Sequence, residues 1–168
     1  MHGNQIVMWA ALAVVVGIPV FVLRRKRKVL SGFDDLIGER KFVARATSPV
    51  AAFVQVNPPE GMHFSKAYDG QLRPGVPMSL LMLKRSEAVM VNGASVANQT
   101  IYIGAYLPAQ TAVSPEFQKL WGENAERKRA DTVYAAPAAE GGFVIIWKGT
   151  PSRANVEARL AAVSQSLT

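Results

Sequence analysis

The longest apolar stretch of this chain lies near its start. Residues 6–23 form 18 consecutive positions without a charged or strongly hydrogen-bonding side chain. As a helix with a rise of about 1.5 Å per residue, this run would extend roughly 27 Å, close to the roughly 30 Å hydrocarbon thickness of a bilayer. Gly17 and Pro19 weaken such a helix, but membrane helices tolerate these residues. The pattern therefore predicts a single transmembrane helix.

A basic cluster follows the apolar run without a gap and consists of Arg24, Arg25, Lys26, Arg27 and Lys28. Positive charge beside a span stays cytoplasmic, so the amino terminus is expected outside and the rest of the chain at the cytoplasmic face of the inner membrane. A cleavable signal would carry its charges before the apolar core, and a buried core helix would lack this flanking charge. We expect a transmembrane helix with its basic cluster over 1–28, in contact with lipid, and a soluble domain over 29–168.

Short apolar segments bounded by turn residues predict strands in the first half of the soluble domain. The expected elements are a helix over 29–39 and strands over 42–46, 51–56, 78–84, 88–91, 94–96 and 100–107. Asn92 and Gly93 favour a tight hairpin turn between two of these strands. Alternation places Ile101 and Ile103 on one face of the last strand and Tyr102 on the other. The segment 68–75 has the composition of a turn.

The second half of the domain shows clearer helix signals. Ser114 followed by Pro115 is typical of a helix start, and the helix is expected to run toward Lys128. Segments 132–135 and 143–147 are expected to form a hairpin, and Thr150 to cap a last helix. That helix has an apolar stripe formed by Val156, Leu160, Val163 and Leu167. The whole pattern predicts an α+β domain with a mainly antiparallel sheet and two C-terminal helices.

The composition excludes several kinds of site and one class of partner. The chain has no Cys, which excludes disulfides, thiolate metal sites and a cysteine nucleophile. Its net charge is +7, but the cluster holds 5 of the 19 basic residues. Residues 29–168 therefore carry 14 basic against 12 acidic side chains. Such a balance provides no basic face of the kind that nucleic acids require, so no nucleic-acid partner is expected.

No catalytic constellation is recognisable in the sequence. The histidines are His2 and His63, too few to fill a metal site without cysteines, and the phosphate-binding glycine motifs are missing. No cofactor or metal is expected. Asp34 and Asp35 suit the first turn of a helix. A carboxylate pair from distant positions, for example Asp69 with Glu87, stays open as an alternative, so enzymatic activity is uncertain and less favoured.

One further segment offers a possible partner surface: Trp121, Arg127, Lys128 and Arg129. The cations suit the end of a helix, where the dipole favours them, but they also suit an anionic leaflet or an acidic partner. Trp121 and Trp147 are more typical of core anchors than of ligand platforms.

Together these features predict a noncatalytic, single-pass interaction or scaffold subunit of a larger assembly at the cytoplasmic membrane. Its expected partners are the lipid bilayer and other membrane or cytoplasmic proteins. By analogy alone, a bacterial envelope machine such as a secretion, pilus or conjugation apparatus would suit this architecture. The alternatives are a membrane-tethered enzyme with dispersed carboxylates and a sensor of anionic lipid.

Overall fold

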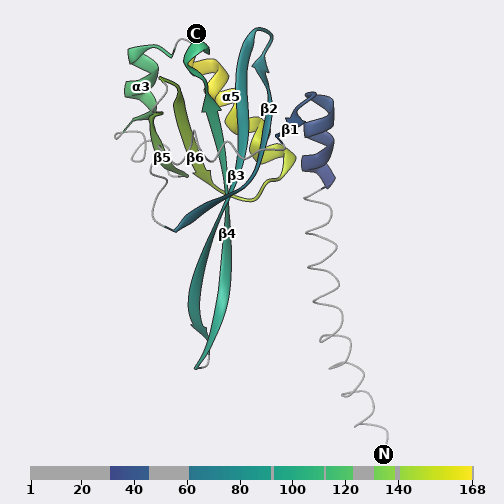
Figure 1. The fold of residues 1–168 in the computed structure, drawn as a ribbon, viewed down its shortest axis with the longest axis vertical. Coiled ribbons are helices and arrows are strands. Elements are labelled where there is room, and N and C mark those ends of the chain that lie inside the picture. Colours follow the sequence, from purple (N-terminus) through teal and green to yellow (C-terminus); the bar gives the residue numbers. More distant parts are fainter. Residues whose placement is uncertain are drawn as a thin grey trace, which may run out of the picture.

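The structure, a computed structural model, describes residues 31–45, 61–91, 93–111, 113–122, 131–138 and 141–167. Its centre is a six-stranded antiparallel sheet in the order β1-β2-β3-β4-β6-β5 (Figure 1). The strands are β1 (Val43–Ala44), β2 (Met62–Arg73), β3 (Val76–Val91), β4 (Ala94–Leu107), β5 (Thr132–Pro137) and β6 (Phe143–Lys148). Residues 31–39 are helical, and the chain also forms η1 (Ala109–Thr111), α3 (Pro115–Trp121) and α5 (Arg153–Ser166). The predicted α+β class with an antiparallel sheet is confirmed.

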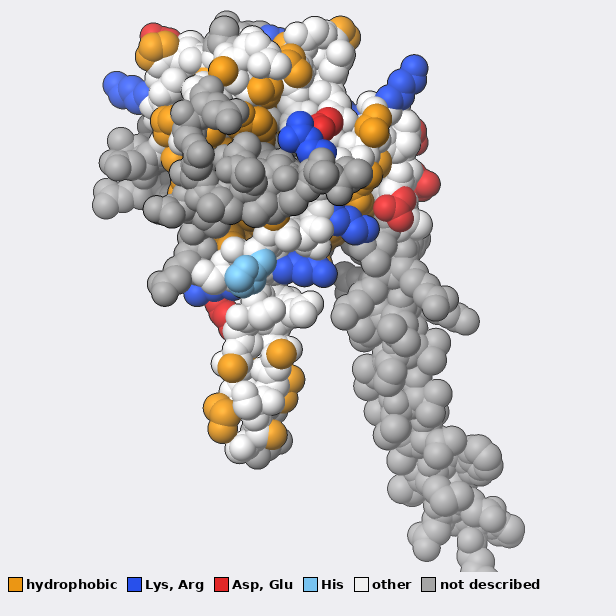
Figure 2. Space-filling model, viewed as in Figure 1, with side chains coloured by type: hydrophobic (Ala, Val, Ile, Leu, Met, Phe, Trp, Pro, Cys, Tyr) orange, Lys and Arg blue, Asp and Glu red, His pale blue; other side chains and the backbone are white. Residues whose placement is uncertain are grey.

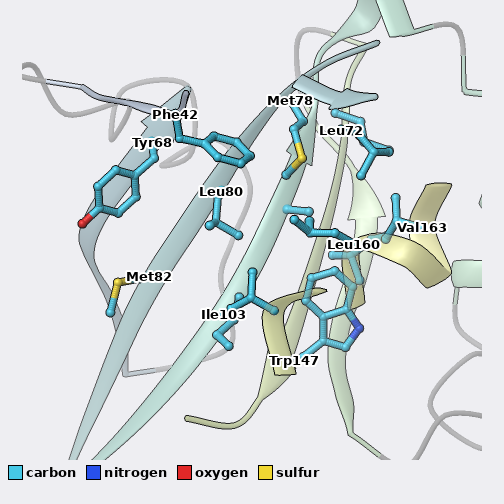
Figure 3. Close-up of a cluster of buried hydrophobic side chains, with 14 of the residues drawn as sticks. Phe42, Tyr68, Leu72, Met78, Leu80, Met82, Ile103, Trp147, Leu160 and Val163 are labelled. Carbon is cyan, nitrogen blue, oxygen red and sulfur yellow. The ribbon is translucent and has the colours of Figure 1, made fainter. Parts of the chain in front are cut away.

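The main core lies between one face of the sheet and the helices (Figure 3). The helices contribute Phe33, Leu36, Phe117, Trp121, Val156, Leu160 and Val163, all of them buried. From β4, Ile103 and Ala105 enter this core, whereas Tyr102 belongs to a second cluster on the opposite face. The alternation predicted for this strand is therefore confirmed.

The first strands are longer than the sequence pattern indicated. β3 is one continuous strand of 16 residues, although its sequence predicted two shorter segments. β2 continues to Arg73, so the predicted turn over 68–75 is confined to Pro74 and Gly75. Gly70 misled the prediction because its role is tertiary: a Cβ there would lie only 2.3 Å from Cδ1 of Phe42. This glycine admits an aromatic ring instead of making a turn.

The helix starts follow capping rules. Ser114 accepts a hydrogen bond from the Phe117 N–H at 3.1 Å, as the sequence predicted. α3 ends at Trp121, earlier than expected, because Gly122 adopts an extended backbone with φ −74° and ψ −155°. In this conformation a Cβ would lie 2.8 Å from the Gln118 carbonyl oxygen, so the position suits glycine. α5 is capped by Ser152 and not by the predicted Thr150.

Several predictions fall outside the described residues. These include the apolar run 6–23, the basic cluster and the strand expected over 51–56. Within the described ranges, no helix has the length and apolar character needed to cross a bilayer.

Candidate interaction surface

β3 and β4 continue beyond the rest of the sheet as a two-stranded ribbon (Figure 1). Arg85 is the last β3 residue that pairs with β2, and Tyr102 is the first β4 residue that pairs with β6. Farther out, residues 86–91 pair with residues 94–99, and the described chain provides no third strand there. We call residues 86–99 the arm.

The end of the arm is apolar and uncovered. Val89 is 39% exposed, Met90 68% and Val96 49%. Val89 lies directly opposite Val96 in the register, and Met90 points to the other face of the ribbon because side chains alternate along a strand. Residues 88–97 contain no charged side chain. Figure 2 shows hydrophobic side chains gathered at this end, an arrangement typical of a contact surface.

The base of the arm is polar and mostly basic. Lys66, Lys84 and His63 are exposed, and His63 lies opposite Lys84 in the β2–β3 register. Arg85 forms an ion pair with Glu87 at 2.9 Å. Figure 2 shows basic side chains and the histidine where the arm leaves the body. The arm therefore carries an uncharged tip on a cationic base.

The helical residues 31–39 are firmly joined to the domain. Phe33 is 2% and Leu36 1% exposed, and the Phe33 ring meets the Tyr68 ring edge-on at 5.7 Å between centroids. Both carboxylate oxygens of Glu39 accept hydrogen bonds from Arg153 on α5, at 2.8 and 2.7 Å. This contact lowers the pKa of Glu39 and raises the pKa of Arg153. Residues 31–39 are thus part of the fold.

An open hollow of about 250 Å³ borders α5 and is lined by Trp121, Asp131, Trp147, Ala158, Arg159 and Ala162. Arg159 donates to the Asp131 carboxylate and, at 3.2 Å, to the Lys148 carbonyl. Its guanidinium also lies 5.8 Å from the centre of the Trp147 ring. These contacts give the two charged groups of the hollow a structural role, joining α5 to β6.

The sequence-predicted site residues are only partly covered by the structure. The basic cluster 24–28 and the cations at 127–129 lie outside the described residues. Trp121 is 1% exposed and meets Trp147 in a T-shaped contact at 6.0 Å, so both tryptophans are core residues.

The carboxylates considered for catalysis lie far apart. Asp69 accepts hydrogen bonds from Ser79, at 2.6 Å, and from Arg45, at 2.5 Å. Glu87 is eight positions beyond Ser79 on β3, roughly 26 Å away at about 3.3 Å per residue. Paired carboxylates in glycoside hydrolysis act at about 5–10 Å, so Asp69 and Glu87 do not form such a pair.

Other chemical groups add little to this picture. His63 is exposed on β2, and burial raises the pKa of Tyr134 on β5. In the part of the chain that the structure describes, no three His, Asp or Glu side chains are grouped to hold a metal ion.

No protein-family model, curated protein or solved structure matches this chain. Its function is therefore inferred from the arm, from the junction at residues 31–39 and from the apolar run with its basic cluster.

Proposed function

We propose that this protein is a single-pass, membrane-anchored interaction subunit of a membrane-associated assembly. Its amino terminus lies outside, and its α+β domain lies at the cytoplasmic face of the inner membrane. The apolar run 6–23 provides the anchor, and the basic cluster 24–28 sets the orientation. No catalytic step is part of this proposal.

The observation that carries the proposal is the junction between the predicted anchor and the domain. Lys28 precedes Ser31 by three residues, which limits their separation to about 11 Å even in an extended chain. From there on, Phe33 and Leu36 are buried in the core. A domain joined in this way is held close to the bilayer, and this restriction lowers the entropic cost of binding a neighbouring subunit in the same membrane.

The body of the domain also offers apolar positions to a protein neighbour. Val43, on the edge strand β1, is 67% exposed, and Leu120, on α3, is 39% exposed. An edge strand has unpaired backbone groups that a second chain can use, and exposed apolar side chains add contact area. These two positions are suitable sites for a crosslinking probe.

Membrane attachment is tested by alkaline carbonate washing of vesicles that contain the full chain, together with a reporter fused to the carboxyl end. The protein should remain in the membrane, and a cytoplasmic reporter should be active. Release by carbonate would contradict the anchor, and a periplasmically active reporter would contradict the orientation.

Assembly is tested with a photo-crosslinking amino acid at Val43 or Leu120 in native membranes, with Glu116 on the polar surface of α3 as the matched control. We expect a discrete adduct from Val43, from Leu120 or from both, and less from Glu116. If the protein gives no adduct and runs as a monomer in detergents that preserve other membrane complexes, it is not an assembly subunit.

A further inference from the structure

The arm and the start of the helical residues 31–39 face the same end of the molecule (Figure 1). Ser31 is the first described residue of this segment, and Lys28, the last residue of the basic cluster, precedes it by three positions. Three residues of extended chain span at most about 11 Å, so a bilayer whose headgroups bind Lys28 must lie within about 11 Å of Ser31. The arm extends toward this side of the domain.

We propose that the arm is a second membrane contact, in which its tip enters the headgroup region of an anionic leaflet. The tip consists of residues 88–97, which carry no charge. It contacts lipid and does not insert into a groove on another protein. The inference rests on the membrane anchor of the proposed function and adds a binding surface that the anchor does not require.

The length of the tip suits insertion into the headgroup region. From Ala88 to Val91 the strand covers roughly 10 Å at about 3.3 Å per residue. Segments that lie in a membrane interface are buried about 5–10 Å into the boundary between headgroups and acyl chains. Met90 and Val96, which are 68% and 49% exposed, are the large apolar side chains that would meet this boundary.

The backbone of the arm limits how far it can enter. Residues 86–91 pair with residues 94–99, and the outer edges of both strands have no pairing partner in the described chain. Unpaired N–H and C=O groups are costly in hydrocarbon but can bond to water and headgroups at the interface. The tip is therefore a shallow contact and not a second span.

The charges at the base of the arm favour lipid over an apolar protein groove. Lys66 and Lys84 are exposed, and neither forms an ion pair with another described residue. With the tip in the headgroups, Lys84 lies four positions from Ala88, about 13 Å along β3, so its charge would face the anionic surface from just outside it, while Lys66, paired with Met82, lies farther back. An apolar tip on a cationic base thus matches an anionic membrane surface on both counts.

The contact is tested by lipid quenching with a label on the tip. Because the chain has no Cys, Met90→Cys provides one labelling site for an environment-sensitive fluorophore on the full-length protein. Lys119→Cys, on exposed α3 at the opposite end of the molecule, is the matched control (Figure 1). Both proteins are labelled and then reconstituted in vesicles of phosphatidylcholine and phosphatidylglycerol that contain spin-labelled lipid.

We expect a headgroup spin label to quench the Met90 fluorophore at least about twofold more than the Lys119 fluorophore, with weaker quenching by a spin label deep in the acyl chains. In vesicles without phosphatidylglycerol, the difference should decrease. Val96→Glu should also decrease it, because a carboxylate within the tip opposes insertion. An unchanged circular dichroism spectrum shows that this exposed substitution leaves the fold intact.

The possible failures are distinguishable. If carbonate releases the protein from the vesicles, the membrane anchor is wrong, and with it the proposed function. If the protein resists carbonate but both fluorophores are quenched equally, only the arm contact is wrong. A Met90 fluorophore that is shielded from aqueous iodide, yet not quenched by lipid spin labels, would place the tip inside protein and also overturn the proposal.

Discussion

Gly70 illustrates, at the scale of a single residue, how a tertiary contact selects an amino acid. The Phe42 ring is 6% exposed and occupies the space that a Cβ on Gly70 would need. Because the ring is enclosed by the core, Gly70→Ala should lower the free energy of unfolding by about 1–3 kcal/mol. Thermal unfolding in mild detergent measures the effect.

The control for this substitution is Gly38→Ala, at a helical position where an added Cβ meets no atom within 4 Å. Alanine is favoured over glycine in a helix, so this variant should equal the wild type or gain up to about 1 kcal/mol. Equal losses from both substitutions would mean that the packing of Phe42 on Gly70 is unimportant.

The ion pair between Glu39 and Arg153 predicts a pH dependence of stability. Arg153 lowers the pKa of Glu39 below its ordinary value of 4.5, so the folded state favours the ionised carboxylate. The resulting stabilisation is present above pH 4.5 and is lost as the pH falls through the lower pKa of the folded state. Glu39→Gln should therefore reduce the melting temperature at pH 7, and the difference should shrink in strongly acidic buffer.

Glu157→Gln serves as the comparison for Glu39→Gln. Glu157 also pairs with Arg153, but within one turn of α5, and such exposed pairs at i and i+4 contribute little. The Glu157 variant should therefore lose less stability at pH 7. A Glu39 variant whose deficit is the same at every pH would argue against the ion pair as the cause.

At the scale of elements, the prediction and the structure differ in the residue that caps α5. The sequence offered Thr150, but the Ser152 hydroxyl accepts the Asn155 N–H at 3.3 Å, while the Thr150 hydroxyl accepts the Asn155 side-chain amide at 3.4 Å. Ser152→Ala should therefore cost about 1 kcal/mol in chemical unfolding, the usual value for a lost cap. Thr150→Ala should cost less, and the reverse order would restore the prediction made from sequence.

Most elements were nonetheless predictable, since their signals are local. Ser114 with Pro115 fixed the start of α3, and Asn92 with Gly93 indicated the β3–β4 hairpin. The misplaced turn before Gly75 had a different cause, because Gly70 responds to Phe42, a residue 28 positions earlier in the chain. Local sequence patterns identify strands and caps, but they carry no information about contacts between residues that are far apart in the sequence.

The tip of the arm, residues 88–97, should be dispensable for the fold. Replacing residues 88–97 by Asn-Gly moves the turn inward by four residues, which keeps the pairing phase and joins Glu87 to its partner Asn98. β2 pairs with β3 only as far as Arg85, so the removed residues do not contact the rest of the sheet through this ladder. The melting temperature should therefore change by less than about 3 °C, equivalent to under about 1 kcal/mol. A larger loss would show that the arm supports the core.

At the scale of the whole molecule, the arm shows why the candidate surface was not predicted from sequence. Val89, Met90 and Val96 belong to apolar segments that resemble half-buried strands. They are exposed only because β2 and β6 end before the arm does, and the lengths of neighbouring strands become visible only in the assembled sheet. The apolar run 6–23, in contrast, is apparent from the sequence because its signal depends on length and composition alone.

The orientation of the whole chain yields the last prediction. Residues 1–5 are free of Lys, Arg, Asp and Glu, so the cluster 24–28 supplies the charge difference across the predicted span. Long domains translocate largely regardless of their own charge, which makes this cluster the main determinant of orientation. Five cations beside an anionic leaflet contribute at most about 5 kcal/mol, and mutual repulsion and salt reduce this value.

Replacing all five cluster residues with Gln should therefore leave the chain resistant to carbonate but give a mixed orientation. A carboxyl-terminal reporter that is active only in the periplasm should change from silent to measurable, while the total amount in the membrane stays similar. The chain with its native cluster and the same reporter is the control. A reporter that stays silent in the Gln variant would mean that the domain, and not the cluster, resists translocation.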